Sequence, residues 1–184
     1  GPAIRQRFGT PRALLALSAH SLARQPVLLA AARHEAVHDF GGFPPALFDL
    51  RYQAPGAPAL AHEVATRLGD AGWPVGVLDQ GGLDHGIWTP LRYLFPDGDV
   101  PVLPLAFVPS DSPARLFALG QALAPLAAQG VLIIGSGSLT HNLRLVFGPG
   151  GMPPVGAPKT AESAAFRGWV ADRTAASDWP ALLD

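Results

Sequence analysis

Apolar residues along the chain gather in short runs that alternate with stretches of helical periodicity. The runs have the length of buried strands and are flanked by turn residues. They cover residues 12–20, 26–32, 73–79, 100–108 and 131–137. Continuous apolar runs of this kind are typical of strands that are covered on both faces, as in a parallel sheet.

Helices are predicted between these runs, at residues 58–72, 85–95, 112–130 and 160–176. In the first of them, Leu60, Val64 and Leu68 fall on one face, as an amphipathic helix requires. Strands that alternate with helices predict an α/β fold: a mostly parallel central sheet flanked by helices, in a single domain over residues 1–184. In such folds the active site lies at the carboxyl edge of the strands.

Composition excludes several classes of function. The chain has 184 residues, 48% hydrophobic and 15% charged, with a net charge of −1 and no basic run, so nucleic acid is not an expected partner. It contains no cysteine, which excludes thiol chemistry and fits a cytoplasmic location. No apolar run reaches about 18 residues, so no membrane-spanning helix is expected. The oligomeric state stays open.

Most of the histidines lie near the ends of predicted strands, where α/β enzymes place their active sites. Four of the six lie at or just after the ends of predicted strands: His20, His38, His85 and His141. Because the carboxyl ends of parallel strands meet at one edge of the sheet, we expect these side chains to converge there.

The segment at residues 33–45, RHEAVHDFGGFPP, contains a literal H-E-x-x-H. A zinc protease needs both histidines on one face of a helix, with the glutamate as base. The preceding residues are predicted to form a strand, and glycine and proline pairs follow at once, so a helix is not expected. The third ligand of the longer protease pattern would be Pro44, which cannot bind metal. We therefore interpret His34 as a loop residue without a metal.

The segment GSGSLTHN, residues 135–142, follows the last predicted strand. It lacks the lysine of a phosphate-binding P-loop and does not match G-x-S-x-G. An esterase that uses Ser136 or Ser138 with His141 is a remote alternative. The simpler interpretation is a tight turn that presents His141. In the segment DHGIW, Asp84 is predicted to cap the helix that begins at His85.

Four stretches carry a resemblance to a known family. They are LSAH (17–20), VHDFGGFPPALFDLRYQAPGAP (37–58), GLDHGIWTPLRYLFPDGDVPVLPL (82–105) and GVLIIGSGSLTHNLR (130–144). In this order they resemble the class III extradiol ring-cleavage dioxygenases, and within them the DOPA-dioxygenase-like branch of the protocatechuate 4,5-dioxygenase catalytic-subunit superfamily.

The resemblance implies an α/β enzyme that uses one non-haem metal and O₂ to open the ring of a catechol-type substrate. Fe(II) is the implied cofactor, and Zn(II) can occupy the site in its place because it binds nitrogen ligands more tightly. By resemblance His38 is a metal ligand, His141 bonds the oxygen of the substrate or of O₂, and His85 delivers a proton. The residues assigned to the substrate pocket are His20, Phe43 and Asn142.

Two family motifs are absent. Members carry a metal ligand in an N-terminal S-H-G motif and another in a C-terminal segment similar to H-P-T-E-E-H, and neither occurs in this sequence. We therefore expect residues 1–184 to be an incomplete catalytic domain. The alternative is a metal-free, inactive homologue that acts as a scaffold or subunit. The resemblance does not decide which catechol is cleaved or at which bond.

Overall fold

The computed structural model describes residues 1–149, 151, 154 and 156–184. The chain forms two compact units, and each is described by itself. The first consists of residues Gly1–Asp111 and Arg115–Gly137, and the second of Ser112–Ala114 and Ser138–Asp184. The prediction that residues 1–184 are one domain stays a prediction.

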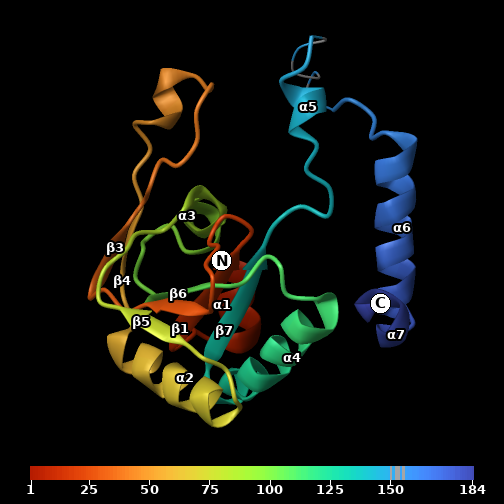
Figure 1. The fold of residues 1–184 in the computed structure, drawn as a ribbon. Coiled ribbons are helices and arrows are strands. Elements are labelled where there is room, and N and C mark those ends of the chain that lie inside the picture. The colour runs from red at the N-terminus through yellow and green to blue at the C-terminus, as the bar shows by residue number, and fades with distance from the viewer. Residues whose placement is uncertain (150, 152–153, 155) are drawn as a thin grey trace. The chain divides into compact units, whose positions relative to one another are not determined.

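A five-stranded sheet forms the centre of the first unit, in the order β5-β2-β6-β1-β7 (Figure 1). Its strands are β1 (Ala13–Ser18), β2 (Val27–Leu29), β5 (Gly76–Leu78), β6 (Val102–Ala106) and β7 (Val131–Ser136). β1 pairs in parallel with β6 and β7, and β2 pairs in parallel with β5. The pairing of β2 with β6 is antiparallel. The predicted α/β fold with a mostly parallel sheet is thus confirmed.

The central strands β1 and β6 are buried on both faces, as their continuous apolar runs predicted, while the edge strands β5 and β7 are partly exposed. Along β1, Leu15 packs into one hydrophobic cluster and Leu14 into another, because successive side chains of a strand point to opposite faces. The first cluster is covered by α2 (Pro58–Asp70), α4 (Pro113–Leu123) and the 3₁₀ segment η2 (Ala124–Gln129). The second is covered by α3 (His85–Leu94).

The helix predicted over residues 112–130 is interrupted. α4 ends at Leu123, and η2 continues the chain with tighter turns. Pro125 has no backbone N–H to donate to a carbonyl four residues earlier, which accounts for the change. Gly130 then ends the segment in the left-handed region, with φ 79°.

A small antiparallel sheet was not predicted. It joins β3 (Arg33–Glu35) to β4 (Gln53–Pro55), with His34 opposite Ala54. The chain between these strands contains the 3₁₀ turn η1 (Pro45–Leu47) and is drawn in orange in Figure 1. The expectation that H-E-x-x-H is not helical is confirmed. The placement of His34 in a loop was wrong, because His34 lies in β3 and is fully buried.

The remaining elements are short or lie in the second unit. They are α1 (Pro2–Phe8) before β1, and α5 (Leu143–Val146), α6 (Ala161–Ala175) and α7 (Trp179–Leu183) in the second unit. α6 begins at Thr160, whose side chain accepts a hydrogen bond from the Ser163 backbone. None of the helices in the described part of the chain is long and apolar enough to cross a membrane.

Candidate metal and catalytic site

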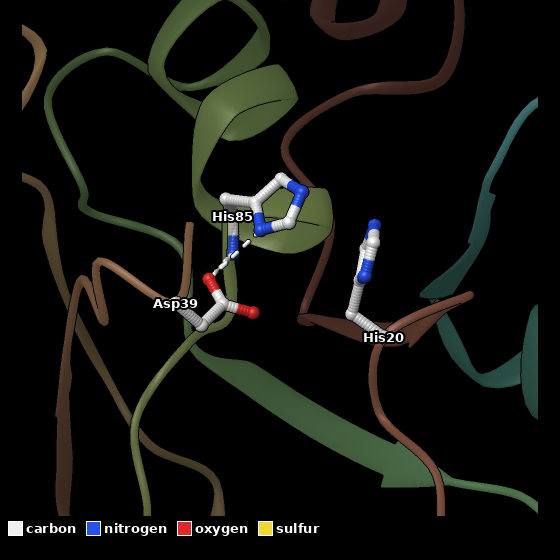
Figure 2. Close-up of side chains that lie close together, drawn as sticks. All are labelled: His20, Asp39 and His85. Carbon is white, nitrogen blue, oxygen red and sulfur yellow. Dashed lines mark hydrogen bonds and ion pairs between the residues drawn. The ribbon is translucent and has the colours of Figure 1, made fainter. Parts of the chain in front are cut away.

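Two histidines and a carboxylate meet in the first unit. One ligand atom from each of His20, Asp39 and His85 lies within 4.8 Å of the other two. The imidazole rings of His20 and His85 have their centroids 4.0 Å apart, with 43° between their planes. Figure 2 shows the three side chains facing one another from three separate segments.

The fold brings these segments together from distant parts of the sequence. His20 follows β1 by two residues, and Asp39 lies in the segment that leaves β3. His85 is the first residue of α3. β5 runs opposite to β1, because it is parallel to β2 and β2 is antiparallel to β6. The carboxyl end of β5 therefore lies away from this edge, and residues 79–84 bring the chain back to it.

Asp84 connects the end of β1 to the beginning of α3. Its Oδ1 accepts hydrogen bonds from the Ser18 hydroxyl at 2.7 Å and from the Gly86 backbone N–H at 2.9 Å. Its Oδ2 accepts a hydrogen bond from the Ser21 hydroxyl. The predicted helix cap is therefore confirmed, and the same carboxylate also binds two serines that flank His20.

Asp39 holds His85 through two contacts. Its Oδ1 accepts a hydrogen bond from the His85 backbone N–H at 3.0 Å and lies 2.8 Å from the Nδ1 atom of the ring. Burial by itself raises the pKa of Asp39, but the hydrogen bonds from His85 outweigh it and lower that pKa. An ionised Asp39 favours the proton on Nδ1 of His85 and leaves Nε2 available for chemistry.

His38, the predicted metal ligand, does not belong to this cluster. Its Nε2 lies 3.0 Å from the Leu50 carbonyl oxygen, which suits an N–H that donates to that oxygen. Its ring packs against Trp88 at 5.4 Å and Phe48 at 6.1 Å between centroids. His38 therefore helps to hold the segment between β3 and β4 closed on itself.

An apolar pocket adjoins the cluster. It has a volume of about 200 Å³ and is lined by Phe40, Phe43, Leu47, Leu50, His85, Trp88 and Thr89. The ring of Phe40 meets that of His85 edge-on, with centroids 5.6 Å apart. Phe43, which was assigned to the substrate pocket, lines this pocket, and His20 lies in the neighbouring cluster.

His141 and Asn142 belong to the second unit, after β7. Asn142 lines a pocket in that unit together with Thr140, Lys159 and Phe166. The assignments of His141 to catalysis and of Asn142 to substrate binding stay predictions, because the cluster and its pocket lie in the first unit.

The donor atoms of the cluster suit a divalent metal. Imidazole nitrogens and carboxylate oxygens, with further positions left open, are the donors that non-haem Fe(II) enzymes use, and the same kinds of atom also bind Zn(II). The Oδ2 atom of Asp39 lies on the side of His20, away from the contact with His85 (Figure 2). Asp39 was not among the site residues expected from the sequence, although its carboxylate directly follows His38 in the segment 37–58.

Comparisons with known proteins agree with the motifs. The sequence profile described as "Catalytic LigB subunit of aromatic ring-opening dioxygenase" matches residues 1–150. This chain belongs to the LigB family. The resemblance inferred from the motifs is thereby confirmed.

Individual LigB relatives carry related names. The chain is 39% identical over 161 residues to "4,5-DOPA dioxygenase extradiol" of Beta vulgaris, covering 87% of the chain and 58% of that protein. It is 41% identical over 138 residues to the protein of the same name from Escherichia coli K12, covering 74% of the chain and 50% of that protein.

A solved structure has a similar fold. It is described as "uncharacterized protein JW3007 from Escherichia coli K12", with a TM-score of 0.62 and 32% identity over 78% of this chain and 53% of the other. The chain thus spans about half the length of the relatives it matches.

Proposed function

We propose that this protein is an extradiol dioxygenase that opens the ring of a catechol-type substrate with O₂ at a non-haem metal site. The observation that carries the proposal is the cluster of His20, Asp39 and His85 beside an apolar pocket. Membership of the LigB family and the names of the relatives support the same reaction class.

His20 and the Oδ2 atom of Asp39 are the proposed metal-binding groups of the first unit. A ferrous ion held there would supply the open coordination positions and the redox chemistry that ring cleavage by O₂ requires. The ionised state of Asp39 suits this role, because a carboxylate binds metal only after it has lost its proton. His38 was assigned as a ligand by resemblance, and with its Nε2 at the Leu50 carbonyl it could bind a metal only through Nδ1.

His85 is the proposed group for proton transfer. Asp39 fixes the orientation of its ring through Nδ1, and the ring also borders the apolar pocket. A catechol must lose protons as it is activated, and the ring-opened product must gain them. Imidazole serves both directions near neutral pH. His141 is proposed as the second group of this kind, from its resemblance to the family motif.

The apolar pocket is the proposed place for the aromatic ring of the substrate. Pockets for drug-sized ligands measure roughly 300–1,000 Å³, so a pocket of about 200 Å³ suits one ring. The aromatic side chains of Phe40 and Trp88 offer flat apolar surfaces to such a ring. His85 brings its polar edge to the same place.

The test is reconstitution of the full-length protein with Fe(II) under anaerobic conditions, followed by addition of a catechol and air-saturated buffer. We expect uptake of O₂ and the new visible absorption of a ring-opened product, with both L-DOPA and 4-methylcatechol as trial substrates. A protein that binds neither Fe(II) nor Zn(II) and consumes no O₂ with any catechol would instead favour the metal-free homologue.

A further inference from the structure

Asp84 connects the two segments that carry the histidines of the cluster. We propose that Asp84 is a positioning residue that sets the spacing between His20 and Asp39, which is bound to the backbone N–H and ring of His85, and so sets the affinity of the site for a divalent metal ion. The inference rests on the proposed function only in that it takes His20 and Asp39 as metal ligands.

On the side of β1, Asp84 acts through two serines. The Ser18 hydroxyl donates to Asp84 Oδ1 at 2.7 Å and accepts the backbone N–H of His20 at 3.1 Å. Ser18 is only 1% exposed, so this hydroxyl has no alternative bond to bulk water. The Ser21 hydroxyl donates to Oδ2. The turn that carries His20 is thus held on both sides of that histidine.

On the side of α3, Asp84 fixes the first turn of the helix. Its Oδ1 accepts the Gly86 N–H at 2.9 Å, which places His85 between two constrained residues. A Cβ atom added at Gly86 would lie 2.2 Å from the Ser18 hydroxyl oxygen. Only glycine therefore permits α3 to approach the end of β1 this closely.

The contacts of Asp84 with β1 and α3 therefore fix the distance between the two imidazole rings. The centroids of His20 and His85 lie 4.0 Å apart although 65 residues separate them in the sequence. Groups behind metal ligands typically change metal affinity or activity by about 10- to 100-fold when they are removed, because they hold the ligands in the geometry that the metal requires. Asp84 contacts the serines and the backbone next to these histidines and is not one of the three clustered residues.

The experiment compares Zn(II) affinity, measured by competition with a chromophoric chelator, in the full-length protein and its variants. Asp84→Ser retains a helix cap, since serine caps as well as aspartate, but it is too short to reach both serines. We expect Zn(II) binding about 10- to 100-fold weaker, together with a changed visible spectrum of the Co(II) form. Ser21→Ala leaves the cap intact and should cause a smaller loss in the same direction.

Asp84→Asn distinguishes geometry from charge. Asparagine retains the Oδ1 acceptor for Ser18 and Gly86 and can present its amide to the Ser21 oxygen, so we expect affinity within about threefold of the parent. Thr160→Ala removes the cap of α6 in the second unit and serves as the matched control. It should lower thermal stability and leave Zn(II) affinity and the Co(II) spectrum unchanged.

His20→Ala separates failure of this inference from failure of the proposed site. If His20→Ala weakens Zn(II) binding while Asp84→Ser and Ser21→Ala do not, the positioning role of Asp84 is refuted. The same conclusion follows if Asp84→Asn loses as much affinity as Asp84→Ser, because charge would then be the cause. If His20→Ala has no effect on Zn(II) binding, the proposed metal site itself is wrong.

Discussion

His20 and His38 both follow short strands, yet the structure holds them in different ways. His20 follows β1 of the central sheet, and its turn is bound through Ser18 and Ser21 to Asp84 at the start of α3. His38 follows β3 of the two-stranded sheet, and its ring nitrogen lies against the Leu50 carbonyl of its own segment. The position of His20 thus depends on a carboxylate from another element, whereas the ring of His38 is held within its own segment.

The largest expected effect is on kcat and comes from His85, which belongs to the same cluster as His20. His85→Gln should lower kcat for catechol cleavage by about 100- to 10,000-fold, because proton transfer contributes that much to such reactions. Fe(II) content, measured by metal analysis, should stay near that of the parent. A variant that loses metal together with activity would show that His85 is a ligand and not the proton-transfer group.

The two strand-end histidines should differ in their effect on metal binding. His20→Ala should weaken Zn(II) binding by at least about tenfold, since each lost ligand removes a strong bond to the metal. His38→Ala should leave Zn(II) affinity within about threefold of the parent. Competition with a chromophoric chelator measures both. The opposite ranking would support His38 as the metal ligand, as the family resemblance implies.

The apolar pocket lined by Phe40 and Phe43 should determine substrate affinity and should not affect metal binding. Phe43→Asp introduces a charge into a lining that is mostly aromatic and aliphatic, and should raise KM for 4-methylcatechol by about tenfold, or roughly 1.4 kcal/mol. Phe8→Asp is the matched control, because Phe8 is 72% exposed at the end of α1. Equal effects of the two variants on KM would contradict the pocket assignment.

The smallest expected effect is on the pH dependence of stability, and it concerns His34, which lies buried in β3. Burial lowers the pKa of His34, while the carbonyls of Gly81, Leu29 and Val102 act against that shift. The unfolded chain therefore binds this proton at a higher pH than the folded protein does. Stability should fall as the pH drops from the unfolded pKa of about 6.5 toward the lowered folded value.

Urea unfolding between pH 5 and pH 8 measures this dependence as the free energy of unfolding at each pH. His34→Gln removes the titrating group and keeps a side chain that can bond the Gly81 carbonyl. The variant should therefore lose stability less steeply than the parent as the pH falls through this range. Parallel curves for the two proteins would show that His34 does not titrate on unfolding.

Much of the fold could be predicted from local patterns. The sequence predicted β1, β6 and β7 from their long apolar runs, and α2 from its helical periodicity. These patterns are long enough to indicate burial without a structure. The H-E-x-x-H segment was correctly judged not to be a helix, from the glycines and prolines beside it. Asp84 was correctly expected to cap α3, because caps depend on neighbouring residues only.

The candidate site could be predicted only in part. His20 and His85 were expected to meet, and the structure shows that they do. The expected reason, two strands that end at the same edge, is wrong for His85, because β5 runs opposite to β1 and residues 79–84 bring the chain back. The sequence HDFGGFP did not reveal that Asp39, and not His38, belongs to this cluster. Adjacent residues in an extended segment point in different directions, and the sequence does not say which of them faces the site. The pairing of His34 with Ala54 likewise depends on a contact between segments far apart in the chain.

The sequence by itself determined which segments are strands and helices, where they are capped, and which side chains offer metal-binding chemistry. Only the tertiary structure decided that β2 and β5 run against β1, that a second small sheet forms, and that Asp84 holds His20 near His85. The physical reason is one of range. Burial patterns and caps act over a few residues, whereas strand direction and the meeting of side chains depend on packing between segments that the sequence keeps apart.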